Sequence, residues 1–147
     1  MAVRAELNNI KSVKQADKFI AHLDDDLSVE ARGYIALLNF IKSRELKSPF
    51  KKMRYFNRAK KLLEQLIELY PSNVELRYLR YSIQVSSPAF LGYNKNVESD
   101  LELMKNEIQF SPLSSKVKKW ILQNLLELDT LNENDRIRFE LELNRLI

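Results

Sequence analysis

The sequence gives the backbone few places to turn sharply, and this limits the possible folds more than any other feature. Only two glycines and four prolines occur among its 147 residues. Architectures built from β-strands need many such residues at their turns, so their scarcity favours a helical chain. No stretch shows a convincing strand pattern of alternating apolar and polar residues. The sequence therefore predicts an all-α fold.

Apolar residues recur at helical spacing in about seven segments. We expect helices over about residues 4–23, 28–46, 48–70, 73–85, 96–110, 113–128 and 130–147. Hydrophobic residues make up 45% of the chain, which is enough for the core of one globular domain of this length. The sequence therefore predicts a single helical domain over residues 1–147.

Several residues indicate where these helices begin. Ser28 and Ser48 are suited to cap a helix N-terminus, and Pro49 suits the first helical position because it lacks an N–H group. Two capping boxes, Ser72-x-x-Glu75 and Thr130-x-x-Glu133, predict further helix starts.

The composition argues against several kinds of enzyme. Cysteine is absent, which excludes disulfides, thiolate zinc sites and cysteine nucleophiles. The single histidine, His22, precedes the acidic run Asp24–Asp26, and one imidazole with solvated carboxylates is a poor metal site. A Gly-rich phosphate loop is also missing. We expect a non-enzymatic protein with no metal and no cofactor.

The amino terminus lacks an apolar signal region, and no apolar run approaches the ~18 residues of a membrane span. We therefore expect no membrane span. The location stays open: cytoplasmic as the chain is written, or extracytoplasmic if a signal peptide has been removed.

Basic residues concentrate on the segment 48–70, which carries six Lys or Arg and two Glu. On a helix, its solvent-facing side would present Lys51, Arg54, Arg58 and Lys61. Tyr55 is interleaved with them, and cations with aromatic rings are typical of nucleic-acid-binding faces. Association with nucleic acid through this basic helix is the alternative function that we consider.

The segment from Ser48 to Asp100 resembles a known family. The matching residues are Pro49-Phe50-Lys51-Lys52, Tyr55-Phe56, Lys60-Lys61-Leu62-Leu63-Glu64, Pro71-Ser72-Asn73-Val74-Glu75-Leu76-Arg77, Leu79-Arg80, Ser82-Ile83-Gln84, Pro88 and Phe90-Leu91-Gly92-Tyr93-Asn94. They are similar to an uncharacterised family of small bacterial all-helical proteins that are regarded as tetratricopeptide-repeat-like (TPR-like). Ala59, Leu63 and Pro71 also match the spacing of a TPR second helix. The resemblance implies a TPR-like array of antiparallel helix pairs, and supplies no catalytic residues.

In TPR-like arrays the first helix of each pair lines a concave groove, and the helix after Asn73 would take that place. Arg77, Arg80, Tyr81 and Gln84 share one of its faces. Two guanidinium groups three residues apart can clamp a carboxylate. We therefore predict that these four residues bind an acidic or C-terminal peptide. The alternative is that Arg77 and Arg80 pair with carboxylates of the acidic carboxyl-terminal helices.

Two apolar regions could either pack into the core or bind a partner. Phe90, Leu91 and Tyr93 are expected to pack inward, and the alternative is an exposed anchor. At Gly92 we expect either a positive φ or a close approach of another part of the chain. The last helix is expected to bury Ile137, Leu141 and Leu143. An exposed apolar helix near the carboxyl end would instead allow the chain to form a homo-oligomer.

These observations predict a non-enzymatic scaffold built of helical repeats, whose biological role the sequence leaves open. The expected partner is another protein or peptide with acidic character, since residues 48–95 are basic overall.

Overall fold

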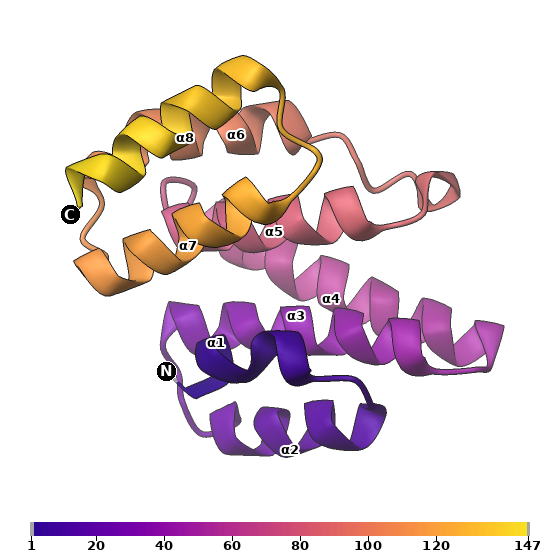
Figure 1. Cartoon of the computed structure of the whole chain (residues 1–147). Helices are drawn as coiled ribbons and strands as arrows, with labels where there is room; N and C mark the ends of the chain where they lie inside the picture. The colour runs from indigo at the N-terminus through magenta and orange to yellow at the C-terminus, as the bar shows by residue number, and fades with distance from the viewer. Residues whose placement is uncertain (1, 147) are drawn as a thin grey trace. The chain divides into compact units, whose positions relative to one another are not determined.

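A computed structural model describes residues 2–146, and this part of the chain is helical without any strand (Figure 1). The α-helices are α1 (Ala2–Glu6), α2 (Val13–Leu23), α3 (Val29–Glu45), α4 (Pro49–Leu69), α5 (Val74–Ser86), α6 (Val97–Glu107), α7 (Ser115–Glu127) and α8 (Glu133–Arg145). Three short 3-10 helices are η1 (Leu7–Asn9), η2 (Ala89–Leu91) and η3 (Ile108–Phe110). The predicted all-α fold is confirmed. None of the helices in this range is both long and apolar enough to cross a membrane.

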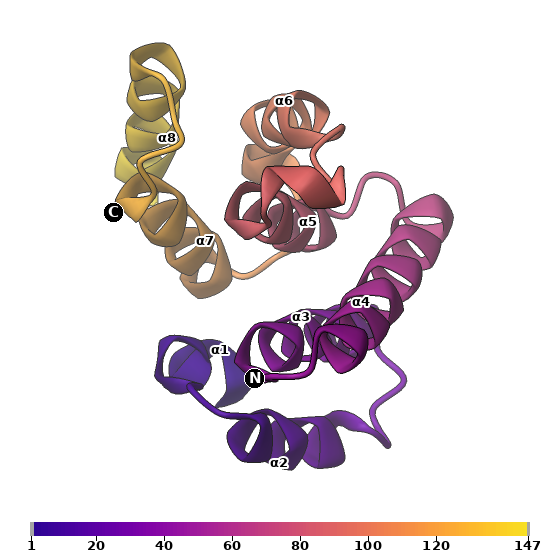
Figure 2. The same ribbon diagram turned by 90° about the vertical axis from the view of Figure 1, so that its right-hand side faces the viewer.

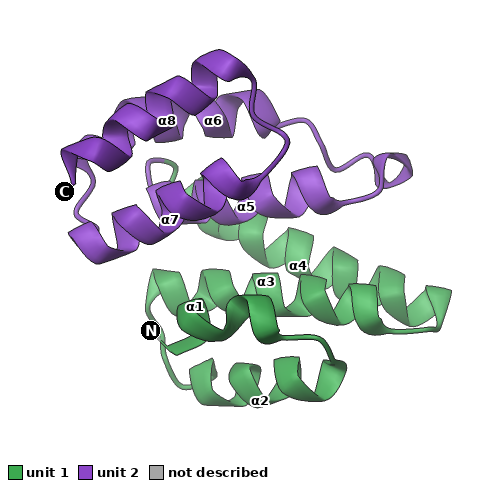
Figure 3. Ribbon diagram, viewed as in Figure 1, with its two compact units in different colours: residues 1–71 green, residues 72–147 purple. Residues whose placement is uncertain are grey.

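The chain divides into two compact units, Met1–Pro71 and Ser72–Ile147 (Figure 3). The boundary lies at Pro71, where the sequence predicts the end of the third helix. The single domain expected over residues 1–147 stays a prediction.

Helix α3 is the centre of the first unit. It contacts both α2 and α4, and Figure 2 shows α2 below it and α4 beside it. Almost every residue from Gly33 to Ser43 is buried, so α3 has no wide polar face. Phe40 of α3 packs against Phe56 of α4 with ring centroids 6.3 Å apart. The large side chains buried here include Tyr34, Leu38 and Leu63.

The first predicted helix is in fact two, which explains why the described chain has eight α-helices and the sequence suggested about seven. The break lies at Ser12, whose hydroxyl accepts a hydrogen bond from the Gln15 N–H at 3.1 Å. Gln15 in turn accepts one from the Lys11 N–H at 2.7 Å. This reciprocal pair closely matches a capping box, and the Ser12-x-x-Gln15 spacing was its signal in the sequence.

The second unit consists of two helix pairs, α5 with α6 and α7 with α8, and α6 also contacts α8. Tyr78 of α5 meets Trp120 of α7 edge to face, with ring centroids 5.5 Å apart. The largest of its fully buried side chains are Leu76, Leu79, Tyr81, Ile83, Met104, Ile108, Ile121, Leu122 and Phe139. All four helices of the second unit therefore contribute to its core.

The helix starts are confirmed at Ser28 and Ser48 and need correction at the two capping boxes. Ser28 and Ser48 accept from the N–H groups of Ala31 and Lys51. Helix α5 is instead capped by Asn73, which accepts from Leu76 at 3.0 Å, and α8 by Asn132, which accepts from Asp135 at 2.8 Å. In both cases an asparagine nearer the helix takes the place of the predicted Ser or Thr, because Asn is an equally good cap.

The loop between α5 and α6 divides the aromatic residues that we expected to pack inward. Tyr93 is buried, whereas Phe90 is 85% exposed on η2. Gly92 has a positive φ of 67°, one of the two expected features, and caps η2 in the left-handed region. An added Cβ there would meet none of the described atoms within 4 Å, so the demand for glycine comes from the backbone alone.

Candidate functional site

The four residues predicted to bind a peptide lie together on α5 and face α6 and the α7–α8 connection. Arg80 donates two hydrogen bonds to the carboxylate of Asp100, from Nε at 2.9 Å and from Nη2 at 2.7 Å. Arg77 donates a third, from Nη1 to Oδ1 at 3.0 Å. Asp100 is fully buried, and the side chains of Arg77 and Arg80 are 14% and 5% exposed. The two arginines therefore clamp a carboxylate of the chain itself.

The other two predicted residues have partners in the same unit. The side-chain amide of Gln84 donates to Asn96 Oδ1 at 2.9 Å and accepts from the Asn96 N–H at 3.1 Å. Asn96 precedes α6, so this paired contact holds the start of that helix. The hydroxyls of Tyr81 and Thr130 lie 2.6 Å apart, and burial raises the pKa of the Tyr81 hydroxyl.

The pairing of Arg77 and Arg80 with Asp100 matches the alternative stated in the sequence analysis, in which the two arginines bind carboxylates of the acidic carboxyl-terminal helices. A peptide carboxylate would have to displace Asp100 and leave that buried charge unpaired, which is costly. Sequence reasoning missed Asp100 as the partner. Its signal was its place on the apolar stripe of α6, three residues after Val97 and four before Met104. A carboxylate on a core face requires a paired cation.

The basic residues of the alternative site lie on α4 and are exposed. Lys51, Arg54, Arg58 and Lys61 follow one side of the helix, and none of them makes an ion pair with another described residue. Two large apolar side chains lie on the same side, Phe50 at 76% and Met53 at 43% exposure. The guanidinium of Arg54 lies 5.6 Å from the centre of the Phe50 ring. We call these six residues the α4 face.

Tyr55, the aromatic residue expected to stack on bases, is half-buried and engaged by two cations. Lys42 Nζ lies 4.1 Å and Arg58 Cζ 4.9 Å from the centre of its ring. Lys42 also forms an ion pair with Asp17 at 2.6 Å. Cation–π contacts of this kind use the faces of the ring that a base would need. The exposed aromatic residue of this helix is therefore Phe50.

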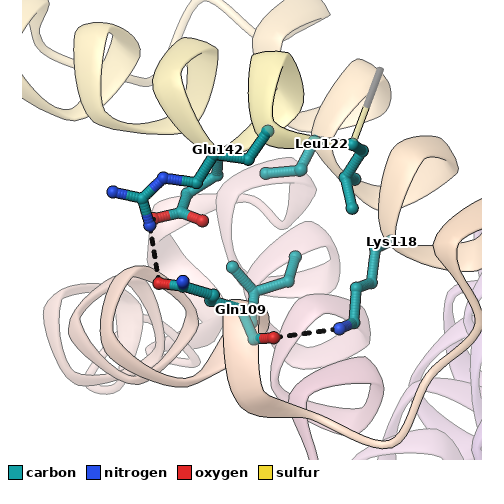
Figure 4. A pocket seen from close by; sticks show the side chains of 7 residues that line it. Gln109, Lys118, Leu122 and Glu142 are labelled. Carbon is teal, nitrogen blue, oxygen red and sulfur yellow. Dashed lines mark hydrogen bonds and ion pairs between the residues drawn. The ribbon is translucent and has the colours of Figure 1, made fainter.

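A small cavity of about 220 Å³ lies in the second unit, between η3, α7 and the end of α8 (Figure 4). Its polar groups bind one another. Lys118 Nζ donates to the Gln109 carbonyl at 3.1 Å, and Arg145 donates to Gln109 Oε1 at 2.6 Å and to the buried Glu142 at 3.2 Å. The cavity is thus small, and Lys118 and Arg145 already bind protein groups.

Lys105 links α6 to the start of α8. Its ammonium contacts both Asp135 and Glu102 at 2.7 Å. The hydrogen bond to Asp135, and then that to Glu102, raise the pKa of Lys105. Asp135 is also buried at the start of α8, where a carboxylate is favoured by the helix dipole. The ion pair with Lys105 therefore gives the buried carboxylate of Asp135 a structural explanation.

Scans against protein-family models, curated proteins and solved structures found no match to this chain. The candidate site therefore rests on the geometry alone.

Proposed function

We propose that the protein is a non-enzymatic helical scaffold that binds an acidic segment of another protein on the α4 face. The observation that supports this proposal is the combination of unpaired cations with exposed Phe50 and Met53 on one side of one helix. A side of a helix that serves only solubility needs no large apolar side chains. Residues 48–70 hold six cations against two carboxylates, so the field there attracts an anionic partner.

The energetics favour a mixed contact. Burying the side chain of Phe50 against a partner would contribute about 2 kcal/mol. Carboxylates near Arg54, Arg58 and Lys61 would add less in free energy, because exposed ion pairs contribute only about 0–1 kcal/mol each. They would mainly accelerate association and select acidic partners. An acidic segment with apolar residues fits this division better than a purely acidic one.

The finer architecture that we propose is a TPR-like array. Helices α3 and α4 contact each other and are joined by the short connection 46–48. Helices α7 and α8 also contact each other and are joined by residues 128–132. Figure 1 shows that each second helix runs back along the first. Antiparallel pairs with short connections are the repeating element of such arrays, which present binding surfaces along their helices.

Nucleic acid is the alternative ligand for the same surface. The four exposed cations of the α4 face favour it, since phosphates are bound largely by neutralisation of charge. The engaged ring of Tyr55 and the large apolar area of Phe50 favour a protein instead. Salt dependence separates the two, because nucleic-acid binding weakens steeply as the salt concentration rises.

Self-association is a second contact that we propose for the scaffold. Ile137 and Leu141, one turn apart on α8, are 48% and 53% exposed, and the buried side of α8 is formed by Phe139 with Asp135 and Glu142. The prediction that Ile137 and Leu141 belong to the core is therefore wrong. A second copy of the chain would cover Ile137 and Leu141 and so form a dimer.

The test is a binding measurement with defined probes. Fluorescence anisotropy would follow a labelled amphipathic peptide with Glu along its polar face, the same peptide with Lys in place of Glu, and mixed-sequence single- and double-stranded DNA. We expect the acidic peptide to bind. The double change Arg54→Glu, Lys61→Glu should weaken that binding about ten-fold or more, since it replaces attraction by repulsion at two contacts.

The matched control is Lys116→Glu, Lys119→Glu. It makes the same change in net charge at two exposed cations of α7. Equal loss in both double variants would show that only the net charge matters, and would contradict a specific site. Binding of DNA in place of the acidic peptide would establish the alternative. Phe50→Ser distinguishes the apolar anchor, because it should weaken binding of the peptide with little effect on binding of DNA.

A further inference from the structure

A larger cavity, of about 480 Å³, lies in the first unit between α1 and α2. Its walls are formed by Ala2, Val3, Gln15, Lys18, Phe19, His22 and Leu23. The volume lies within the range of about 300–1,000 Å³ that is usual for small-molecule sites. It is more than twice the volume of the cavity beside Glu142. The two cavities also differ in the state of their polar groups.

The polar groups of this cavity come from one side of α2. Gln15, Lys18 and His22 recur at helical spacing, so they follow one another along the helix. Lys18 and His22 are exposed, and neither makes an ion pair or a hydrogen bond with another described residue. Beside Glu142, by contrast, Lys118 and Arg145 are already bound to protein groups. Of these two cavities, the one in the first unit has two polar side chains, Lys18 and His22, that bind no other described residue.

The remaining walls are apolar. Phe19 lies on α2 between Lys18 and His22 in sequence, Leu23 is buried below them, and Val3 of α1 is 1% exposed. A ligand that fits these walls has an apolar body and one anionic head, which Lys18 would bind as an ammonium and His22 as a ring donor. A cationic head would be repelled by Lys18, and a fully polar ligand would leave the apolar walls uncovered.

We propose that the cavity between α1 and α2 binds an amphipathic carboxylate with an aliphatic body. Lys18 and His22 bind its carboxylate, while Phe19 packs against its chain above the buried Val3 and Leu23. This proposal is independent of the function proposed for the α4 face, because the two share no residue. It assigns a role to His22, the only histidine, which the sequence left without one.

Isothermal titration calorimetry of the full chain tests it with decanoate, decanol and decyltrimethylammonium as probes. We expect decanoate to bind most tightly and decyltrimethylammonium to bind at least ten-fold more weakly. Lys18→Glu should weaken decanoate about ten-fold or more, since a charged hydrogen bond is replaced by repulsion. Any affinity tag belongs at the carboxyl end, because Ala2 lines the cavity.

Lys14→Glu is the matched control, an exposed lysine of the same helix outside the cavity. A second variant, Ala2→Trp, fills the cavity from an exposed position and should abolish binding without loss of helix by circular dichroism. Equal weakening by Lys14→Glu and Lys18→Glu would overturn the proposal. So would equal binding of decanoate and decyltrimethylammonium, or decanoate binding that survives Ala2→Trp.

Discussion

Arg80 and Asp100 form a two-bond ion pair between α5 and α6, with both side chains at or below 5% exposure. The pair joins positions twenty residues apart in sequence. It connects the two helices whose contact forms much of the second unit. Its removal is therefore expected to affect folding before it affects any binding.

Asp100→Asn should destabilise the second unit by about 3–5 kcal/mol, because it leaves Arg80 buried without its counter-ion. Urea unfolding followed by Trp120 fluorescence would measure the loss. Glu102→Gln is the control on the same helix, since the Glu102 side chain is 61% exposed and should cost less than about 1 kcal/mol. Equal effects of the two changes would contradict a structural role for the buried pair.

The N-cap of α5 can be assigned by a pair of substitutions. Asn73→Ala should cost about 1 kcal/mol, because the Leu76 N–H loses its acceptor. Ser72→Ala, the position expected from the capping box, should change the free energy of unfolding by no more than a few tenths of that. Chemical denaturation of both variants decides between them, and a larger cost at Ser72 would restore the original assignment.

Gly92→Ala should destabilise the chain by about 1–2 kcal/mol through backbone strain at φ 67°. Gly92→Asn should cost less, since asparagine adopts the left-handed region more readily than alanine. The space around the position is open, so any difference between them reflects the backbone alone. Thermal unfolding would rank the three proteins, and equal stability of Gly92→Ala and wild type would show that this loop adapts.

Alkaline pH should destabilise the second unit. Burial raises the pKa of Tyr78 to about 12, above its ordinary value near 10, so the folded chain holds a proton that the unfolded chain releases. The contribution of this proton to the free energy of unfolding is fully present below pH 10. It is lost as the pH rises toward 12, which lowers the free energy of unfolding by roughly 2–3 kcal/mol. Tyr78→Phe should remove most of this slope in urea titrations, leaving smaller parts from Tyr81 and Lys105, whose pKa values are also raised. An unchanged slope would contradict the assignment to Tyr78.

Association through α8 should be weak and sensitive to two side chains. Sedimentation velocity over a range of concentrations should show a monomer–dimer equilibrium in the wild type. Ile137→Ser, Leu141→Ser should abolish it while leaving the helix content unchanged, because both side chains are about half exposed. Phe50→Ser serves as the control for a general loss of exposed apolar area. A wild type that stays monomeric would eliminate this contact.

Local signals in the sequence located most helices. Ser28 and Ser48 define helix starts by accepting hydrogen bonds from N–H groups three residues on, and Pro49 by its fixed φ at the first helical position. Neighbours in sequence therefore suffice to find these starts. The same rule was ambiguous at α5 and α8, where two cap-forming residues stand close together. Ser72 and Asn73 are equally suitable by type, and the backbone geometry of the folded chain selects the second.

The buried sides of the helices were harder to predict. In α8 the apolar residues Ile137, Phe139, Leu141 and Leu143 alternate, so helical spacing alone supports more than one side. The structure buries Phe139 and pairs the carboxylates of Asp135 and Glu142 with cations. The four α5 residues were correctly placed on one face. Their partners, Asp100, Asn96 and Thr130, lie 12 to 49 residues away, beyond the reach of any local pattern.

The edge-to-face contact between Tyr78 and Trp120 makes the two units distinguishable by spectroscopy. Trp120 is the only tryptophan of the chain, and it lies in the second unit. Its emission therefore reports the melting of residues 72–147, whereas far-ultraviolet ellipticity sums the helices of both units. The separation between the two melting curves measures how far the units unfold as one cooperative system, without any added label.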